Sequence, residues 1–378
     1  MTDRTELLVV GAGPYGVAVA AHAMARGIGT RVLGRAMGFW TDNMPAGMFL
    51  RSGPDWHLDA SGIHTFEAFL EDRDIAPAEI DPVPISVFLD YAGWFQAHKR
   101  VSADDRMVER LEEAGGSFVA HLSDGGAIAA DRVVAAPGNR FFRHVPEWAA
   151  ALPPEVVAHT CDVVDFDDVS GGRVLIVGGR QNAYEWAALF GDHGAERIDI
   201  VHRHDVPDFD RVSWKFVDRY VERTIRTPGW WRSLDQARRD EIAHEFWRVG
   251  RLTLEWWLTP RISDARFHRW AGASVVDAVA EPRPTVTLSN GRRLEVDRIV
   301  LATGYRADIS RVPYLEALAP RLATSSGFPS LDHTFQSSVA GLYLPGFVAT
   351  QDFGPFFGFT KGCPAAATLV VEDLLAGG

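Results

Sequence analysis

Short apolar runs recur along the chain, each followed by a glycine turn and then by an apolar helical stretch. The first run covers residues 7–10 (LLVV), the helical stretch covers residues 17–26, and the next run covers residues 30–33 (TRVL). A short run of β-branched and apolar residues bounded by turn residues predicts a buried parallel strand. The pattern therefore predicts a β–turn–α–β unit at the start of the chain.

A second unit of the same kind follows in the middle of the sequence. Residues 174–177 (VLIV) predict a strand, residues 182–190 a helix, and residues 198–201 a further strand. Residues 207–261 are rich in tryptophan and helical in pattern, with the clearest helix over residues 233–248. We expect this Trp-rich segment to be an insertion or lid rather than part of a sheet.

The stretches around these two units predict more local structure. Residues 44–84 are rich in Gly, Pro and Asp and predict an irregular segment, whereas residues 87–100 predict an amphipathic helix. Residues 117–122 and 131–135 predict strands, and residues 285–296 predict a hairpin closed on an Asn-Gly turn. Strands that alternate with helices predict an α/β protein with mostly parallel sheets.

Composition narrows the class of protein. The chain of 378 residues is long enough for two domains, and its 47% hydrophobic and 23% charged residues are ordinary for a globular protein. The net charge of −12 argues against nucleic acid or an anionic membrane as the main partner. With no signal sequence and no long apolar run, we expect a cytoplasmic protein.

The cysteines and histidines exclude two kinds of site. Cys161 and Cys363 lie far apart in the sequence and form no C-x-x-C motif, so we expect neither a redox dithiol nor a zinc site. The spacing of the histidines at positions 57, 64, 202 and 204 does not predict metal binding. We therefore expect no metal.

The first glycine turn is the clearest candidate for chemistry. Gly11, Gly13 and Gly16 fit G-x-G-x-x-G between a predicted strand and a predicted helix, the context in which this motif binds the diphosphate of a dinucleotide. The alternative is a glycine turn in a fold that binds no nucleotide. The second strand ends in Gly34-Arg35 where an acid normally holds a ribose, so Arg35 either contacts the adenosine end or is simply solvated.

The second glycine turn departs from the full motif. Gly178 and Gly179 are present, but Arg180 stands where a glycine normally lets the diphosphate approach the backbone. The guanidinium either pairs with phosphates or impairs the site. Arg203, between two histidines, gives the next strand a cationic end that favours NADPH over NADH; a unit that has lost its nucleotide is the alternative.

The order of motifs resembles the flavin-containing and N-hydroxylating branches of the flavin-dependent (class B) monooxygenases. The resemblance lies in the two glycine turns followed by the segments at residues 300–305 (VLATGY) and 341–347 (GLYLPGF), with residues 135–138 (AAPG) as a variant of an earlier crossover. It implies two Rossmann-like domains, an NAD(P)-binding domain (161–280, with the insertion at about 207–261) inserted into an FAD-binding domain (1–160 and 281–378).

The resemblance also implies roles for individual residues. Residues 48–52 resemble the segment beneath the flavin ring, where Ser52 is the nearest match to a polar residue that supports the oxygenated flavin, and Arg51 could hold a substrate carboxylate. The implied FAD contacts are Gly11, Gly13, Pro14, Tyr15, Gly16, Arg35, Trp40, Leu50, Thr303, Gly304, Gly346, Phe347 and Phe357. The implied NADPH contacts are Gly178, Gly179, Arg180, Gln181, Asn182 and Arg203. For the aromatic residues, core packing is the alternative.

The implied activity is an NADPH-dependent monooxygenase that contains FAD, reacts with O₂ and oxygenates a small amine or amino-acid-like substrate through a flavin hydroperoxide. Three alternatives stay open from the residues alone. The chain could be a flavin oxidase or dehydrogenase with a degenerate NADPH site, a non-enzymatic flavin-binding protein, or an NAD(P)-only dehydrogenase. The closing segments at 300–305 and 341–347 argue against the last of these.

Overall fold

The computed structural model describes residues 3–377 and contains one mainly parallel and one wholly parallel sheet, which follow the two predicted units. The first sheet has the order β3-β2-β1-β6-β5-β4, and β19 also pairs with β6. Its strands are β1 (Asp3–Val10), β2 (Thr30–Leu33), β3 (Ala103–Asp104), β4 (Val108–Ala114), β5 (Ser117–Leu122), β6 (Ala127–Ala135) and β19 (Leu342–Tyr343). β1, β2, β3, β6 and β19 pair in parallel, and β4 and β5 form an antiparallel hairpin on the edge.

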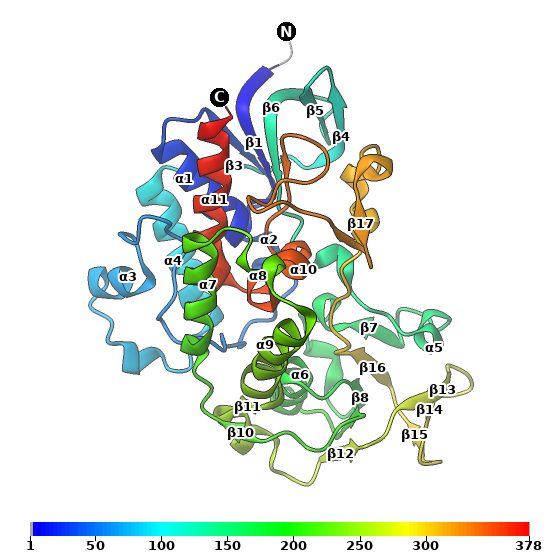
Figure 1. Cartoon of the computed structure of the whole chain (residues 1–378). Helices are drawn as coiled ribbons and strands as arrows, with labels where there is room; N and C mark the ends of the chain where they lie inside the picture. Colours follow the sequence, from blue (N-terminus) through cyan, green and yellow to red (C-terminus); the bar gives the residue numbers. More distant parts are fainter. Residues whose placement is uncertain (1–2, 378) are drawn as a thin grey trace.

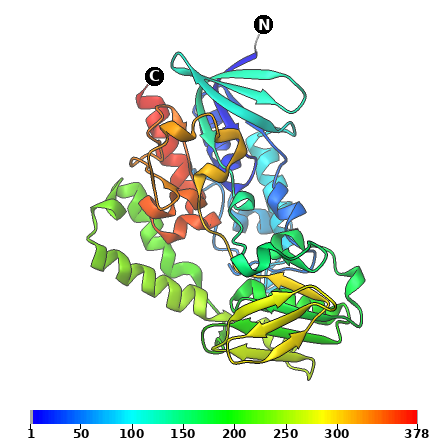
Figure 2. The same ribbon diagram turned by 90° about the vertical axis from the view of Figure 1, so that its right-hand side faces the viewer.

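The second sheet is parallel throughout, in the order β12-β9-β8-β16-β7. Its strands are β7 (Val157–His159), β8 (Arg173–Val177), β9 (Arg197–His202), β12 (Phe267–Ala271) and β16 (Arg298–Leu301). A three-stranded antiparallel sheet of β13 (Val275–Val279), β14 (Thr285–Leu288) and β15 (Arg293–Glu295) packs beside it and includes the predicted hairpin. Figure 2 shows this small sheet in yellow at the lower end of the molecule.

Helices pack against both of these sheets. Those of the first unit are α1 (Pro14–Ala25), α2 (Gly38–Asp42), α3 (Phe66–Asp72), α4 (Ile85–Lys99), α10 (Thr350–Phe353) and α11 (Cys363–Ala376), and those that follow β6 and β8 are α5 (Glu147–Ala150) and α6 (Gln181–Asp192). α11 returns from the far end of the chain to pack along α1 (Figure 1). Among the described residues, no helix is long and apolar enough to cross a bilayer.

The insertion leaves the second unit after β9 and returns to it at β12. It contains α7 (Asp218–Arg226), α8 (Trp230–Ser233) and α9 (Gln236–Trp247), with the short pair β10 (Phe209–Asp210) and β11 (Leu254–Glu255) at its base. Its apolar side chains, Trp214, Tyr220, Trp230, Trp231 and Phe246 among them, belong to the same buried core as β1 and α11. The insertion is therefore packed against the first unit, beside the C-terminal helices (Figure 2), and is not a free flap.

The structure corrects two details of the sequence prediction. Residues 44–84 are not wholly irregular, since they contain α3, whose N-cap Thr65 accepts a hydrogen bond from the N–H of Ala68. The edge strand β4, with its alternating charged residues, was not predicted. Finally, β7 and β16 pair within the second sheet, so this sheet extends on both sides of the expected segment 161–280; the domain limits themselves remain a proposal.

Candidate functional site

The first glycine turn is shaped by close backbone contacts. Gly11 has φ +108°, and a Cβ there would lie 2.3 Å from the carbonyl oxygen of Ala136. A Cβ on Gly16 would lie 1.8 Å from the carbonyl oxygen of Gly11, so α1 can approach β1 only without a side chain at this position. By contrast, a Cβ on Gly13 would meet nothing within 4 Å. The space above Gly13 is open, as a bound diphosphate requires.

α1 begins at this open space. Gly13 is its N-cap and Pro14 its first residue, and no side chain caps the helix. The first-turn N–H groups, with the positive end of the helix dipole, are therefore available to an anion. Tyr15 fixes the helix start to the C-terminal loop, because its hydroxyl is 2.6 Å from the carbonyl oxygen of Phe357 and 2.8 Å from that of Phe359.

A cavity of about 300 Å³ extends from this turn. This volume is at the lower end of the roughly 300–1,000 Å³ of usual small-molecule pockets. It reaches from Gly13 past the first turn of α6, so the N-termini of both nucleotide-unit helices face one space. Of the residues implied as site residues, its wall contains Gly13, Pro14, Tyr15, Gly16, Trp40, Leu50, Arg51, Ser52, Gln181, Asn182, Gly346 and Phe347.

Other implied contacts lie outside this wall. Arg35 is 62% exposed and forms an ion pair with Asp42, which fits the solvated alternative. The ring of Phe357 is fully buried in the core, and its carbonyl oxygen accepts from the Tyr15 hydroxyl. Thr303 and Gly304 are held at the crossover between the two units, where the N–H of His144 donates to the carbonyl oxygen of Gly304.

Arg51 is occupied by contacts with the insertion. Its Nη1 lies 2.7 Å from the carbonyl oxygen of Gly250, its Nη2 lies 2.8 Å from that of Thr253, and its Nε lies 3.3 Å from Oε1 of Glu255. Its guanidinium carbon also lies 5.3 Å from the ring centre of Trp214. Three of its five N–H donors are used in these contacts, so Arg51 fastens the insertion to the first unit. Because Arg51 also lines the cavity, its expected role in holding a substrate carboxylate stays a prediction.

The backbone of the second glycine turn resembles that of the first, but side chains occupy the space that is open at the first turn. Gly178 has φ +148°, and a Cβ there would lie 2.4 Å from the carbonyl oxygen of Ala302, as for Gly11 and Ala136. Arg180 takes the place of Gly13 as N-cap of α6. Its guanidinium carbon lies 3.6 Å from the ring centre of Trp247 on α9, so the insertion covers this turn.

Histidines fill the other side of the second turn. A Cβ on Gly179 would lie 2.5 Å from Cβ of His202 and 2.6 Å from Nε2 of His204. Burial, with the charge of Arg203, lowers the pKa of Arg180 to about 10. A diphosphate can therefore approach this turn only if Arg180 or the histidines move.

Sequence reasoning missed the carboxyl groups of the cavity. Glu185 lines it one helical turn after Gln181, and burial raises the pKa of Glu185 to about 8 against the opposing charge of Arg51. Glu255 lies behind the wall, and its backbone N–H donates to Oε1 of Gln181 at 3.1 Å. Burial raises the pKa of Glu255 to about 7 although Arg51 is its partner. The available signal was the i, i+4 spacing of Gln181 and Glu185 directly after the second glycine turn.

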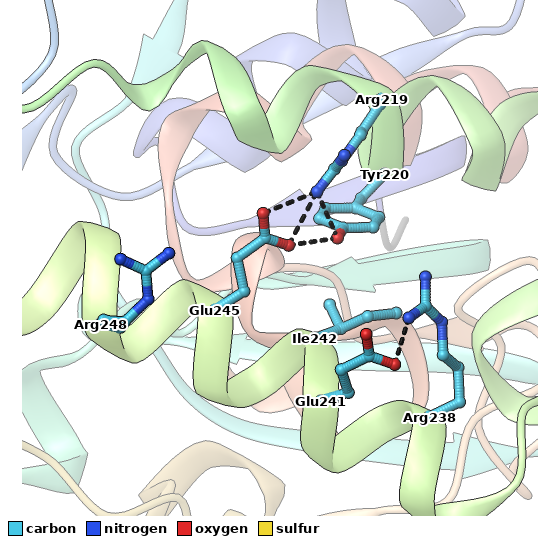
Figure 3. A pocket seen from close by; sticks show the side chains of 7 residues that line it. All are labelled: Arg219, Tyr220, Arg238, Glu241, Ile242, Glu245 and Arg248. Atoms are coloured by element: carbon cyan, nitrogen blue, oxygen red, sulfur yellow. Dashed lines mark hydrogen bonds and ion pairs between the residues drawn. The ribbon is translucent and has the colours of Figure 1, made fainter.

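A second hollow lies on the insertion between α7 and α9 (Figure 3). Here the Tyr220 hydroxyl donates to Glu245 at 2.6 Å, Arg219 donates to both oxygens of Glu245, and Arg238 pairs with Glu241. These charges satisfy one another at an open surface, so we assign the hollow to the packing of α7 on α9.

Neither cysteine takes part in a disulfide, since Cys161 and Cys363 are both free and buried. Over the described part of the chain no cluster of His, Cys, Asp or Glu could hold a metal ion.

The sequence of this chain is similar to those of known proteins. A family model described as pyridine nucleotide-disulphide oxidoreductase matches residues 8–227. An FAD-dependent urate hydroxylase of Xanthomonas campestris is 31% identical over 147 residues, and this match covers 37% of the chain but only 31% of that relative. A ferredoxin–NADP reductase of Thermus thermophilus is 25% identical over 92% of the chain and 86% of its own length.

Several solved structures resemble the structure of this chain over nearly its whole length. An ornithine hydroxylase from Pseudomonas aeruginosa has a TM-score of 0.75 at 19% identity, with 99% of each chain covered. An ornithine N-hydroxylase from Kutzneria sp. 744 gives 0.77 at 17% identity and 99% of each chain. A bacillithiol disulfide reductase from Staphylococcus aureus gives 0.70 at 16% identity, covering 100% of this chain and 99% of that one. The predicted α/β fold with two Rossmann-like units is confirmed.

Proposed function

The chain belongs to the pyridine nucleotide-disulphide oxidoreductase family, and from that premise we propose that it is an FAD-dependent monooxygenase that uses NADPH. The observation that carries the proposal is the open space above Gly13. It lies at one end of a single cavity whose other end reaches the N-terminus of α6. A dinucleotide held at the first turn would thus extend its reactive end toward the second unit.

The residues around the first turn fit FAD. The backbone of Gly11 to Gly16 and the uncapped start of α1 would hold the diphosphate. Trp40, Leu50 and Phe347 offer apolar wall to a flat ring system. When bound there, FAD supplies electron transfer and the activation of O₂. Residues 1–160 and 281–378 are proposed as the FAD-binding part.

The second unit supplies the proposed NADPH site. Gln181 and Asn182 stand at the uncapped N-terminus of α6. Arg203 is exposed and has no ion-pair partner among residues 3–377. Burial, with the charges of Arg306 and Arg203, lowers the pKa of His144, which lines a hollow with Arg306 and Arg311. Positive charge at the end of β9 supports a phosphate-bearing cofactor. Arg180 would have to leave Trp247 for the diphosphate to enter.

The insertion is proposed to keep water from the reaction. Trp214 lines the cavity and lies against Phe359, with ring centres 5.0 Å apart. Arg51 and Lys361 fasten the insertion to the first unit, Lys361 through contacts at 3.3 Å to Asp55 and 2.7 Å to Asp218. A closed, apolar site favours oxygen transfer over side reactions with solvent.

The substrate is proposed to be a small organic molecule. One relative is named as a hydroxylase of urate, and two similar structures are named as hydroxylases of ornithine. An amine or amino-acid-like substrate is the first option and a planar heterocycle the second. Disulfide reduction is not favoured, because the free cysteines Cys161 and Cys363 lie in no common motif.

A second candidate is a flavin oxidase or dehydrogenase that no longer uses NADPH. The stacking of Arg180 on Trp247 and the histidines beside Gly179 favour it. Mixing the FAD-loaded protein with NADPH without oxygen separates the two: bleaching of the flavin absorbance supports the monooxygenase, and an unbleached flavin at millimolar NADPH supports the second candidate. Readmitting O₂ with substrate then tests for an oxygenated product.

A further inference from the structure

Five aromatic rings form a continuous series from the cavity wall to the surface of the first unit. The series begins at Trp40, which lines the cavity and has its ring centre 4.4 Å from that of Phe88. The next ring is Trp56, 5.5 Å from Phe88 and 6.0 Å from Tyr91. The last is Trp94, 6.3 Å from Tyr91. Phe88 and Tyr91 are fully buried, whereas Trp94 is partly exposed, so the series connects the cavity to solvent.

The backbone explains why these rings follow one another. Phe88, Tyr91 and Trp94 are spaced three residues apart on α4, so each lies next to the following one along one side of the helix. α4 packs beside α3 (Figure 1), and the segment before α3 supplies Trp56. The series is therefore held by a helix and not by a loose surface loop.

The hydrogen bonds inside the series favour passage of an electron over its capture. Tryptophan and tyrosine are the side chains that lose one electron most readily, but an oxidised tyrosine must also pass its proton to a base. The Tyr91 hydroxyl donates to the carbonyl oxygen of His64 at 3.1 Å, and a carbonyl oxygen is a poor base. Nε1 of Trp56 is buried and has no hydrogen-bond partner in the described part of the chain. Neither ring can release its proton, so neither would hold an oxidation.

The outer end of the series differs in this respect. The indole N–H of Trp94 donates to Oδ2 of Asp72 at 3.0 Å, and the Asp72 side chain is 55% exposed. An indole that has lost an electron is a much stronger acid than a neutral indole, so its proton would pass to this carboxylate. An oxidation that reaches Trp94 would therefore stay there as a neutral radical at the surface.

Core packing alone does not account for the indole at position 56. Phenylalanine would also fill a buried aromatic site, and it would bury no unpaired N–H. Trp56 is 3% exposed, and a buried donor without a partner costs about 1–3 kcal/mol. Easy one-electron oxidation is a property that an indole has and a phenyl ring lacks.

We propose that Trp40, Trp56 and Trp94 conduct single electrons from the surface to the cavity, which gives the protein a second activity, the light-driven reduction of its flavin by an external haem protein. The inference rests on the proposed function, since it needs FAD in the cavity. Flavins take part in one-electron chemistry, and light makes an oxidised flavin a strong one-electron oxidant.

The electrons and protons of the proposed route balance. Trp40 gives one electron to the light-excited oxidised flavin, Trp56 replaces that electron, and Trp94 replaces the electron of Trp56. Trp94 then passes its N–H proton to Asp72. A ferrous haem protein outside the cavity returns one electron to Trp94, and the proton comes back from Asp72. In each turnover the flavin gains one electron and the haem iron loses one.

The test illuminates the FAD-loaded protein with blue light in the absence of oxygen and follows the oxidation of ferrocytochrome c, which is too large to enter the cavity. We expect light-dependent oxidation with the wild type and a rate at least several-fold lower with Trp94→Phe. Electron paramagnetic resonance of illuminated, frozen samples should show a neutral tryptophan radical in the wild type and not in Trp94→Phe. Asp72→Asn keeps an acceptor but takes up no proton, so the radical should stay cationic.

The matched control is Trp270→Phe. Trp270 lies on β12 in the second unit and also donates its indole N–H to a carboxylate, that of Asp199 at 2.8 Å. It takes no part in the series, so its replacement should leave the light-driven rate unchanged. Trp56→Phe interrupts the route inside the core and should slow the reaction as Trp94→Phe does, with FAD affinity unchanged.

Equal rates for the wild type and Trp94→Phe would overturn the inference, and so would an equal loss in Trp270→Phe or an illuminated wild type without a tryptophan radical. FAD content and reduction by NADPH in the dark are measured on the same samples. A protein that holds FAD and is reduced by NADPH but oxidises no cytochrome in light contradicts this inference alone. A protein that holds no FAD contradicts the proposed function as well.

Discussion

Replacing Arg51 with methionine separates a structural role from a substrate-binding role. The substitution removes three contacts to the insertion, at Gly250, Thr253 and Glu255. A hydrogen bond to a charged group contributes about 1.5–3 kcal/mol, and leaving one partner of a buried ion pair alone costs about 3–5 kcal/mol. Because these losses overlap, we expect a total of about 3–5 kcal/mol at alkaline pH.

The pH dependence follows from Glu255. Its pKa is raised from the ordinary 4.5 to about 7 in the native state, so between these values the native state binds more protons than the unfolded state and stability falls as pH rises. Without Arg51 the pKa of Glu255 in the native state rises further. At pH values above that pKa, each unit of the rise lowers the free energy of unfolding by about 1.4 kcal/mol. At pH 5 Glu255 is protonated in both native proteins, so only about 1–3 kcal/mol should be lost there.

Thermal unfolding followed by tryptophan fluorescence at pH 5 and pH 9 measures the effect, and limited proteolysis with thermolysin shows whether the insertion is cut first. The double variant Arg51→Met with Glu255→Gln should recover part of the loss at pH 9. The exposed pair of Arg226 and Glu222 offers the control, since Arg226→Met should shift the midpoint little. An Arg51→Met protein with an unchanged midpoint and weaker binding of a carboxylate ligand would refute the structural role.

Two further substitutions test the contacts around the insertion. Arg180→Gly removes the guanidinium from Trp247 and restores the glycine of the motif, so FAD retention should stay the same while the rate of flavin reduction by NADPH changes at least several-fold in either direction; an unchanged rate would place Arg180 away from that cofactor. Lys361→Met leaves Asp55 and Asp218 without their cation and should lower the unfolding midpoint by the equivalent of about 1–3 kcal/mol, and a midpoint equal to that of the wild type would show that these contacts contribute nothing.

The nucleotide units could be predicted from sequence because their signals are local. The run at residues 7–10, the glycines that follow and the strand at 30–33 all lie within one β–turn–α–β unit, and the structure has the strand at the predicted bounds. The close contact of Gly11 with Ala136 explains why the first glycine is required.

What was missed depends on contacts between residues far apart in the sequence. Arg51 meets the insertion some two hundred residues later, and no local pattern indicates that pairing. Glu185 resembles an ordinary helical glutamate until burial beside Gln181 is known. The tryptophans of the insertion suggested a lid, whereas the side chains of Trp214, Trp230 and Trp231 lie in the core of the first unit.

The most direct test of the central claim is the FAD content of three proteins, measured as flavin per chain and as affinity of the apoprotein for FAD. Gly13 and the exposed Gly93 of α4 both have open space where a Cβ would stand, so leucine should be accommodated at either position. We predict one FAD per chain for the wild type and for Gly93→Leu, and loss of FAD from Gly13→Leu in a folded protein. A Gly13→Leu protein that holds FAD as tightly as the wild type would contradict the account.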